Sequence, residues 1–79
     1  MLSITLNGEL RNVRPGSSIA DLAAEIGLDP KKVAVERNLE IVPRSTLADV
    51  PIAEGDRLEI VHFVGGGQAD TWEVAGKTF

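Results

Sequence analysis

Residues 57–64 constrain the fold most, because they carry apolar side chains on both faces of one predicted strand. Strict alternation puts Leu58 and Ile60 on one face, and Val61 and Phe63 on the other. Apolar residues on both faces imply two packed faces, so this strand belongs in a sheet that another layer covers. Three glycines follow it directly.

A hairpin is predicted at the start of the chain. Residues 2–6 alternate apolar and polar side chains, as a half-buried strand does. Asn7-Gly8 is a strong signal for a two-residue hairpin turn, and residues 9–13 supply the return strand. Pro15-Gly16 ends that strand, since proline lacks a ladder donor and glycine permits a turn.

The next segment predicts one amphipathic helix. Ser18 and Asp21 have the spacing of a capping box, with the shorter acid in place of Glu. Apolar side chains then recur at the helical period, at Ile19, Leu22, Ala23 and Ile26. Gly27 stands where a left-handed C-terminal cap is needed, and Asp29-Pro30 keeps the helix from resuming.

Two short strands complete the predicted sheet. Residues 33–36 alternate again, and Asn38 allows a turn before a short strand at 40–42, which Pro43 ends. One helix can cover one face of a mixed sheet of four to five strands. The predicted class is therefore α+β, and the predicted fold is the ubiquitin-like β-grasp.

Composition narrows the classes of function. A chain of 79 residues with 43% hydrophobic and 25% charged content suits one soluble domain. It has no cysteine, and His62 alone cannot build a metal site. A formal net charge of -4 argues against nucleic acid and favours a partner with a basic surface. The absence of cysteine suits a reducing cytoplasm. No apolar run approaches the roughly 20 residues of a membrane span, and residues 1–5 lack the basic and apolar pattern of a signal peptide, so a cytoplasmic protein is predicted.

The triple glycine Gly65-Gly66-Gly67 is unusual as structure. An ordered glycine costs about 0.5 to 1 kcal/mol more than alanine in backbone entropy, so the segment is predicted to be mobile. A tail without β-carbons could enter a narrow channel, where an enzyme brings a terminal carboxylate to the α-phosphate of ATP. A plain linker is the alternative, because glycine runs between ordered pieces often serve that purpose.

Residues 1–67 resemble a known family, the ThiS sulfur carriers of thiamine biosynthesis. The specific part of the resemblance is the last strand with its glycines. The charged segment before that strand also matches the family. The matching stretches are Val35-Glu36-Arg37-Asn38, Ile41-Val42-Pro43-Arg44, and the run from Gly55-Asp56-Arg57 through His62-Phe63-Val64 to Gly65-Gly66-Gly67.

The resemblance implies a protein cosubstrate and not an enzyme. A ThiF-like adenylyltransferase would use ATP to adenylate the C-terminal glycine, which is Gly67, or Gly66 as in relatives with two glycines. Sulfur from a cysteine desulfurase system would then give a thiocarboxylate. The carrier would deliver this sulfur to a ThiG-like thiazole synthase. No catalytic residue, metal or bound cofactor is implied for the chain itself.

The chain departs from the family after Gly67, because residues 68–79 follow where the family has a free carboxylate. Residues 70–79 resemble the opening strand of thiazole synthase, which indicates a carrier fused to its acceptor enzyme and cut off after the junction. The predicted domains are the carrier, 1–67, and a flexible tail, 68–79. Hydrolysis after Gly67 would free the carboxylate. A cloning scar or a mispredicted stop is the alternative origin of the tail.

The end of the last strand is also a candidate docking surface, formed by Val61, His62, Phe63 and Val64. The helix covers one face of the sheet only. If Leu58 and Ile60 face the helix, Val61 and Phe63 lie on the open face, where an apolar patch rimmed by charge marks a docking site. The alternative is that they fill a second small core. The charged residues at 36, 37, 40 and 44 are read as a solvated surface, and the alternative is that their opposite charges steer a partner.

Three other functions stay open. A sulfur carrier for molybdopterin synthesis has the same predicted fold and a glycine ending. A domain that only docks on the fused thiazole synthase would need no free carboxylate. A ubiquitin-type modifier would be found linked to lysines of other proteins.

Overall fold

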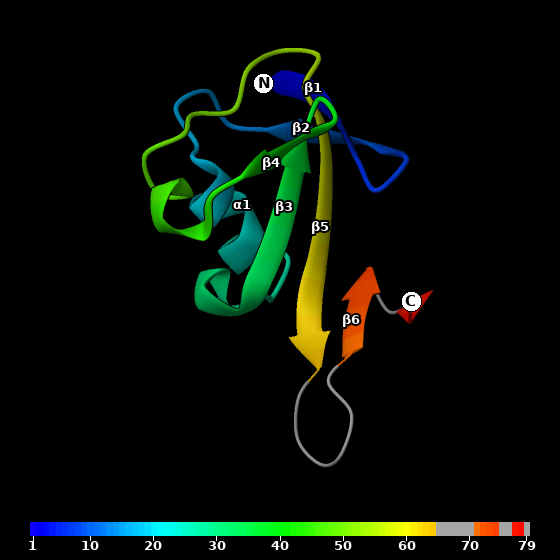
Figure 1. The fold of residues 1–79 in the computed structure, drawn as a ribbon. Coiled ribbons are helices and arrows are strands. Elements are labelled where there is room, and N and C mark those ends of the chain that lie inside the picture. Colours follow the sequence, from blue (N-terminus) through cyan, green and yellow to red (C-terminus); the bar gives the residue numbers. More distant parts are fainter. Residues whose placement is uncertain (65–70, 75–76, 79) are drawn as a thin grey trace.

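The computed structural model describes residues 1–64, 71–74 and 77–78 (Figure 1). Its helix and strands are β1 (Leu2–Leu6), β2 (Glu9–Val13), α1 (Ile19–Glu25), β3 (Val33–Arg37), β4 (Glu40–Val42), β5 (Arg57–Val64), β6 (Thr71–Val74) and β7 (Lys77–Thr78). Short 3-10 turns at Pro30–Lys32 and Arg44–Thr46 join them.

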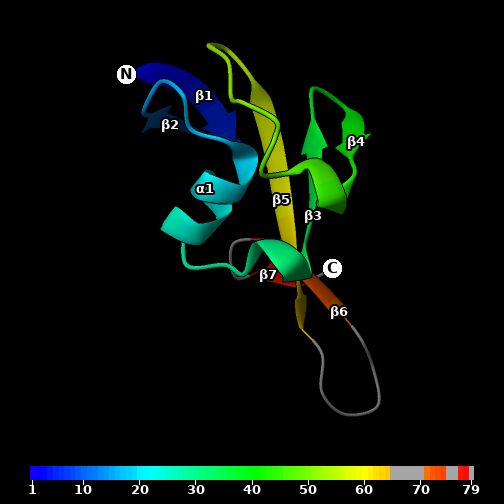
Figure 2. The same cartoon turned by 90° about the vertical axis from the view of Figure 1, so that its left-hand side faces the viewer.

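The main sheet has the order β2-β1-β5-β3-β4. Within it, β1 and β5 are parallel neighbours and pair at Leu6 and Leu58. All other pairings are antiparallel. Figure 2 shows α1 lying across one side of this mixed sheet, with β5 in the centre. The predicted α+β class, with five strands and one covering helix, is confirmed.

Both ends of α1 follow the local signals. The Ser18 hydroxyl accepts from the Asp21 N–H at 3.0 Å, and the Asp21 carboxylate accepts from the Ser18 N–H at 2.9 Å. This is the predicted capping box. At the other end Gly27 has φ +88° and donates to the Ala24 carbonyl, while Leu28 donates to the Ala23 carbonyl. These two bonds make a Schellman cap, which requires the left-handed residue that glycine supplies.

One hydrophobic core lies between α1 and the sheet. Leu58 and Ile60 of β5, which alternation places on one face, are fully buried in it. The core consists of Ile4, Leu6, Val13, Ile19, Leu22, Val33, Val35, Leu47, Ile52, Leu58 and Ile60. β5 is the central strand of the sheet. Its position is therefore fixed by core contacts on one of its faces and by neighbouring strands along both of its edges.

Two hairpin turns use residues with positive φ. Asn7 and Gly8 have φ values of 51° and 84°, and Asn38 and Leu39 have values of 51° and 72°. Positive φ at both central residues is the requirement of the type I′ turn, whose twist matches that of the flanking strands. The predicted turns at Asn7-Gly8 and Asn38 are confirmed. Leu39 at such a position is unexpected, because a side chain with a β-carbon is strained there.

The segment 68–79 is predicted to be a flexible tail, but part of it forms strands. Residues 71–74 form β6, which pairs antiparallel with the end of β5, and β7 pairs with β6. Two features explain the difference. The β6 sequence Thr-Trp-Glu-Val has high strand propensity, and among the described residues no other strand lies beside this part of the β5 edge. Residues 65–70, 75–76 and 79 lie outside the described residues.

Candidate functional site

Strand β5 leads directly into the predicted reactive glycines. Gly65, Gly66 and Gly67 themselves lie outside the described residues, so their predicted role stays a prediction. The structure does fix the strand from which they depart. Leu58 and Ile60 have 0% exposed area, and β3 pairs with β5 as far as His62. The glycines therefore follow a strand whose position is fixed by buried side chains and by pairing with β3.

The side chain of Asn7 extends the pairing of β1 with β5. The two strands are aligned at Leu6 and Leu58, and Asn7 donates its backbone N–H to the Leu58 carbonyl at 2.9 Å. Its side-chain oxygen accepts from the Ile60 N–H at 2.8 Å, and its side-chain nitrogen donates to the Ile60 carbonyl at 3.2 Å. The amide thus occupies the place of one more strand residue. The sequence pattern at Asn7-Gly8 predicts only the turn and not this second role of Asn7.

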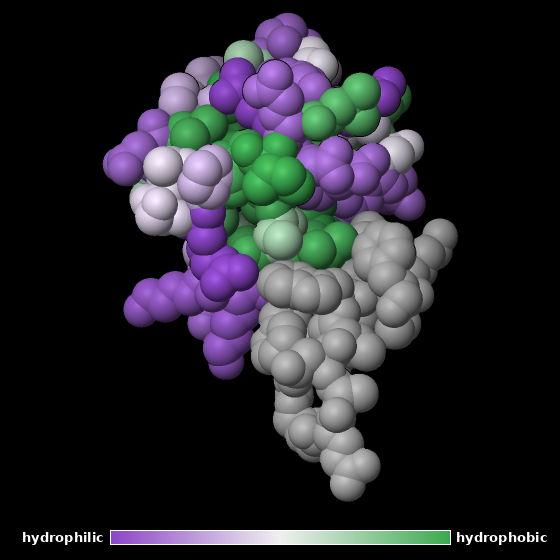
Figure 3. All heavy atoms as spheres, in the orientation of Figure 1, coloured by the Kyte–Doolittle hydropathy of each residue, from purple (hydrophilic) through white to green (hydrophobic). Residues whose placement is uncertain are grey.

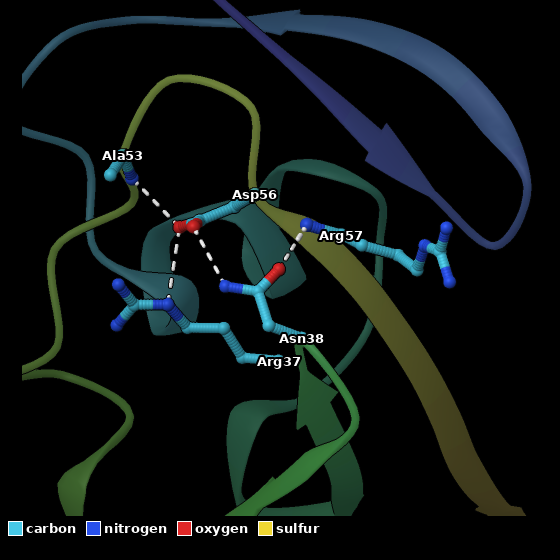
Figure 4. A network of polar contacts seen from close by, with 5 residues as sticks. All are labelled: Arg37, Asn38, Ala53, Asp56 and Arg57. Carbon is cyan, nitrogen blue, oxygen red and sulfur yellow. Dashed lines mark hydrogen bonds and ion pairs between the residues drawn. The ribbon is translucent and has the colours of Figure 1, made fainter.

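A buried carboxylate organises the other end of β5 (Figure 4). Asp56 is 5% exposed, and one of its oxygens accepts from the Ala53 N–H at 2.8 Å. The same oxygen lies 3.2 Å from Nε of Arg37. The other oxygen accepts from the side-chain amide of Asn38 at 3.2 Å. Asp56 is therefore paired and hydrogen-bonded, as a buried charge must be.

Asn38 connects this carboxylate to the first residue of β5. Its side-chain oxygen accepts from the Arg57 N–H at 2.9 Å, and its own N–H donates to the Arg57 carbonyl at 2.8 Å. The β3–β4 turn is thereby tied to the start of β5. The interpretation of Arg37 as a solvated surface charge is wrong, because it pairs with Asp56. Arg44 is exposed, as predicted, and its Nε donates to the Val33 carbonyl at 3.0 Å.

The four predicted docking residues lie in a row on β5. Val61 and His62 are half-buried, and alternation turns them to opposite faces of the sheet. Val61 stands opposite Ala34 of β3, on the open face. His62 stands opposite Val33, on the face that α1 covers. In the backbone register, Phe63 is aligned with Trp72 and Val64 with Thr71 of β6. A single patch on the open face therefore does not include His62.

The open face around Val61 combines apolar and acidic side chains. Glu36 and Glu59 are direct cross-strand neighbours, and Ile41 of β4 stands opposite Glu36 with 73% of its area exposed. Figure 3, viewed as in Figure 1 toward the β4 edge of the sheet, shows apolar surface gathered over β3 and β4 with polar side chains around it. This arrangement suits a partner with apolar contacts and basic side chains.

The described residues contain no group of three or more His, Cys, Asp or Glu side chains that could hold a metal ion. Nor does this part of the chain contain a helix with the length and apolar character to cross a bilayer.

The model of the ThiS family matches residues 4–67. The sulfur carrier protein ThiS of Bacillus subtilis is 42% identical over 65 residues, which cover 81% of this chain and 98% of that protein. A crystal structure of the thiamine biosynthesis protein ThiS from Geobacter metallireducens superposes with a TM-score of 0.68 at 26% identity, covering 84% of this chain and all of that one.

The whole chain also aligns with proteins of another name. A thiazole synthase of Paramagnetospirillum magneticum is 54% identical over an alignment of 80 residues, and one from Magnetococcus marinus is 48% identical over 81. Each alignment covers 99% of this chain, so it includes the segment after the glycines. The chain spans 25% of the length of these two relatives.

Proposed function

Because the chain belongs to the ThiS family, we propose that residues 1–67 are a sulfur carrier for thiamine biosynthesis, joined to the beginning of a thiazole synthase. The family match carries this proposal, because it ends at Gly67, the third glycine. The Bacillus subtilis carrier supports it, since 98% of that protein aligns with 81% of this chain. The carrier has no catalysis of its own in this proposal; it presents a carboxylate to enzymes.

The proposed chemistry takes place at the terminal carboxylate of Gly67. A carboxylate oxygen attacks the α-phosphate of ATP on a ThiF-like enzyme, and pyrophosphate leaves. The terminal sulfur of a persulfide on a cysteine desulfurase system then attacks the acyl carbon, and AMP leaves. A thiol attacks the sulfur–sulfur bond of the resulting acyl disulfide and forms a disulfide with the donor's sulfur, which frees the thiocarboxylate that a ThiG-like thiazole synthase consumes. Gly66 takes this role if the carrier ends after two glycines.

This chemistry needs a free carboxylate, and the chain has an amide bond between Gly67 and Gln68. Hydrolysis of that bond is therefore part of the proposal. It adds water across the amide, leaving the carboxylate on Gly67 and an amine on Gln68. The buried side chains of β5 and the Asp56 network support a rigid base for the glycines. Such a base lets a partner hold the strand while it draws the tail into its site.

Intact mass spectrometry tests the proposal with three chains, 1–66, 1–67 and 1–79. Each is incubated with the ThiF-like enzyme, ATP and a sulfur donor. A mass gain equal to the replacement of one oxygen by sulfur is expected for 1–67 and not for 1–79. The chain 1–66 decides between the two glycines. No gain in any chain, with an enzyme that is active on another carrier, would contradict the sulfur-carrier function.

A docking domain fused to thiazole synthase is the second candidate. The observation that favours it is the match of both thiazole synthases across the whole chain, including the residues that block the carboxylate. In that case cells would contain only the intact fusion and would still make thiamine. The relatives described above have names from thiamine biosynthesis, so they give no support to a molybdopterin carrier.

A further inference from the structure

The edge of β5 that faces away from β3 is covered by three different pieces of the chain. β1 pairs with its first part, at Arg57 and Leu58. The amide of Asn7 then binds the backbone of Ile60. β6 pairs with the last four residues, Val61–Val64. β6 must lie on this side, because β3 already pairs with two of the same residues from the other side. We call the part from Ile60 to Val64 the outer edge.

The backbone groups on the outer edge can be identified. The Leu58 carbonyl and both backbone groups of Ile60 point to this side, since Asn7 binds them there. Successive residues of a strand alternate in direction, so the N–H and C=O groups of His62 and Val64 point the same way. The register aligns His62 with Glu73 and Val64 with Thr71. Without β6, this end of β5 would be an open strand edge.

An open edge with unpaired backbone groups is a template for another strand. Extended peptides add to such edges, with main-chain hydrogen bonds giving affinity. In this chain the outer edge has already accepted a strand, and it lies directly before the glycines. A partner that draws the glycine segment into its active site must approach the same end of β5.

We propose that the outer edge of β5 is a docking surface for an extended segment of the adenylating enzyme, and that β6 covers it within the chain. This inference rests on the proposed function, because that function supplies the partner. β6 and the enzyme segment then compete for the backbone groups of His62 and Val64. A strand tethered through a short linker acts at an effective concentration in the millimolar range, so it competes strongly. β6 thus blocks docking of the enzyme until it is released from β5.

Binding of the ThiF-like enzyme from the same organism, measured without ATP, tests this competition. The chain 1–67 serves as the reference. It is expected to fold on its own, because the crystal structure of ThiS from Geobacter metallireducens superposes over its whole length on 84% of this chain. It is compared with 1–79 and with 1–79 carrying Glu73→Pro. Proline removes the N–H that faces His62, so β6 loses a ladder donor. Glu73→Ala is the matched control, because it shortens the same side chain and keeps that N–H.

The expected result is that 1–67 binds at least about tenfold more tightly than 1–79, a difference of about 1.4 kcal/mol. Glu73→Pro should recover most of this affinity, and Glu73→Ala should leave 1–79 weak. Amide exchange at His62 and Val64 should rise in the proline variant only, with residues 1–60 unchanged.

Three outcomes would overturn the inference. Equal binding of 1–67 and 1–79 would mean that β6 blocks nothing. Weak binding of Glu73→Pro would mean that the tail obstructs the enzyme by bulk alone. Absence of binding by 1–67 would mean that the edge is no docking surface. The proposed function fails separately, when 1–67 gains no sulfur in the mass experiment.

Discussion

The side-chain amide of Asn7 forms two hydrogen bonds with the backbone of Ile60, at 2.8 and 3.2 Å. A turn residue thereby acts as an extra strand residue and satisfies two groups on the edge of a central strand. Neutral hydrogen bonds contribute modestly when both partners can return to water, but a buried group left unpaired costs more. Ile60 is fully buried, so this pairing should matter for stability.

Asn7→Gly is therefore expected to lower the free energy of unfolding by about 1 to 3 kcal/mol. Glycine keeps the positive φ that the turn requires, so the loss reports on the amide and not on the turn. Asn7→Ala should cost more, because it loses the amide and also strains the turn. Urea denaturation of both variants measures this. A glycine variant as stable as the parent chain would show that Asn7 serves the turn alone.

Asp56 gives a second prediction about stability. Asp56→Ala leaves the Ala53 N–H, the Asn38 amide and the Arg37 guanidinium without their acceptor. Arg37 is 33% exposed and can turn to water, so we expect a loss of about 2 to 3 kcal/mol instead of the larger cost of a fully buried pair. Thermal and urea unfolding measure the loss.

Asp49→Ala is the matched control for Asp56, because Asp49 is exposed. It should change the free energy of unfolding by less than about 0.5 kcal/mol. Similar losses in both variants would contradict the assignment of Asp56 as the centre of the network.

The β3–β4 turn leads to a stabilising substitution. Leu39 is 74% exposed and has φ 72°, so its side chain gains little burial while its backbone is strained. Leu39→Gly should raise the free energy of unfolding by about 0.5 to 1 kcal/mol, because relief of the strain exceeds the entropy that glycine adds to the unfolded chain.

The same substitution at Leu10 should have the opposite sign. Leu10 is 87% exposed and lies within β2, where it has no positive φ. Leu10→Gly should therefore destabilise by about 0.5 to 1 kcal/mol, as glycine does inside a strand. Two changes of the same sign, read from urea denaturation, would contradict strain at Leu39.

The elements that can be predicted from the sequence depend on local signals. The capping box of Ser18 and Asp21 spans three positions, and the cap at Gly27 is set by its neighbours. Alternation in β5 predicts from the period of a strand that Leu58 and Ile60 share one face, and the structure shows that this face is the buried one. The family resemblance over residues 1–67 was also visible in the sequence, and the family match confirms it.

The contacts that the sequence does not predict join positions far apart in the chain. Asn7 meets Ile60 only because β1 lies parallel to β5, and no local pattern specifies that order. The sequence gives Arg37 the character of a surface charge, and only the folded position of β3 brings it beside Asp56. The pairing of β6 depends on an edge that exists only in the folded sheet. Such contacts follow from topology, which short-range periodicity does not determine.

The open face supplies the last prediction, which concerns docking. Val61 is half-buried opposite Ala34, and Glu36 and Glu59 are the next cross-strand pair on that face. An apolar centre beside two carboxylates suits a partner with basic side chains. Val61→Lys places a positive charge at this centre, so it should weaken binding of the ThiF-like enzyme to chain 1–67 by about tenfold or more.

Leu10→Lys is the control for Val61→Lys. Both substitutions add one positive charge, and Leu10 lies on β2, separated from β5 by β1. The control should bind like the parent chain, and urea denaturation of both variants separates lost docking from lost folding. Equal weakening by the two variants would trace the effect to net charge. Unchanged binding by a folded Val61→Lys chain would remove Val61 from the docking surface and leave the outer edge of β5 as the contact with the enzyme.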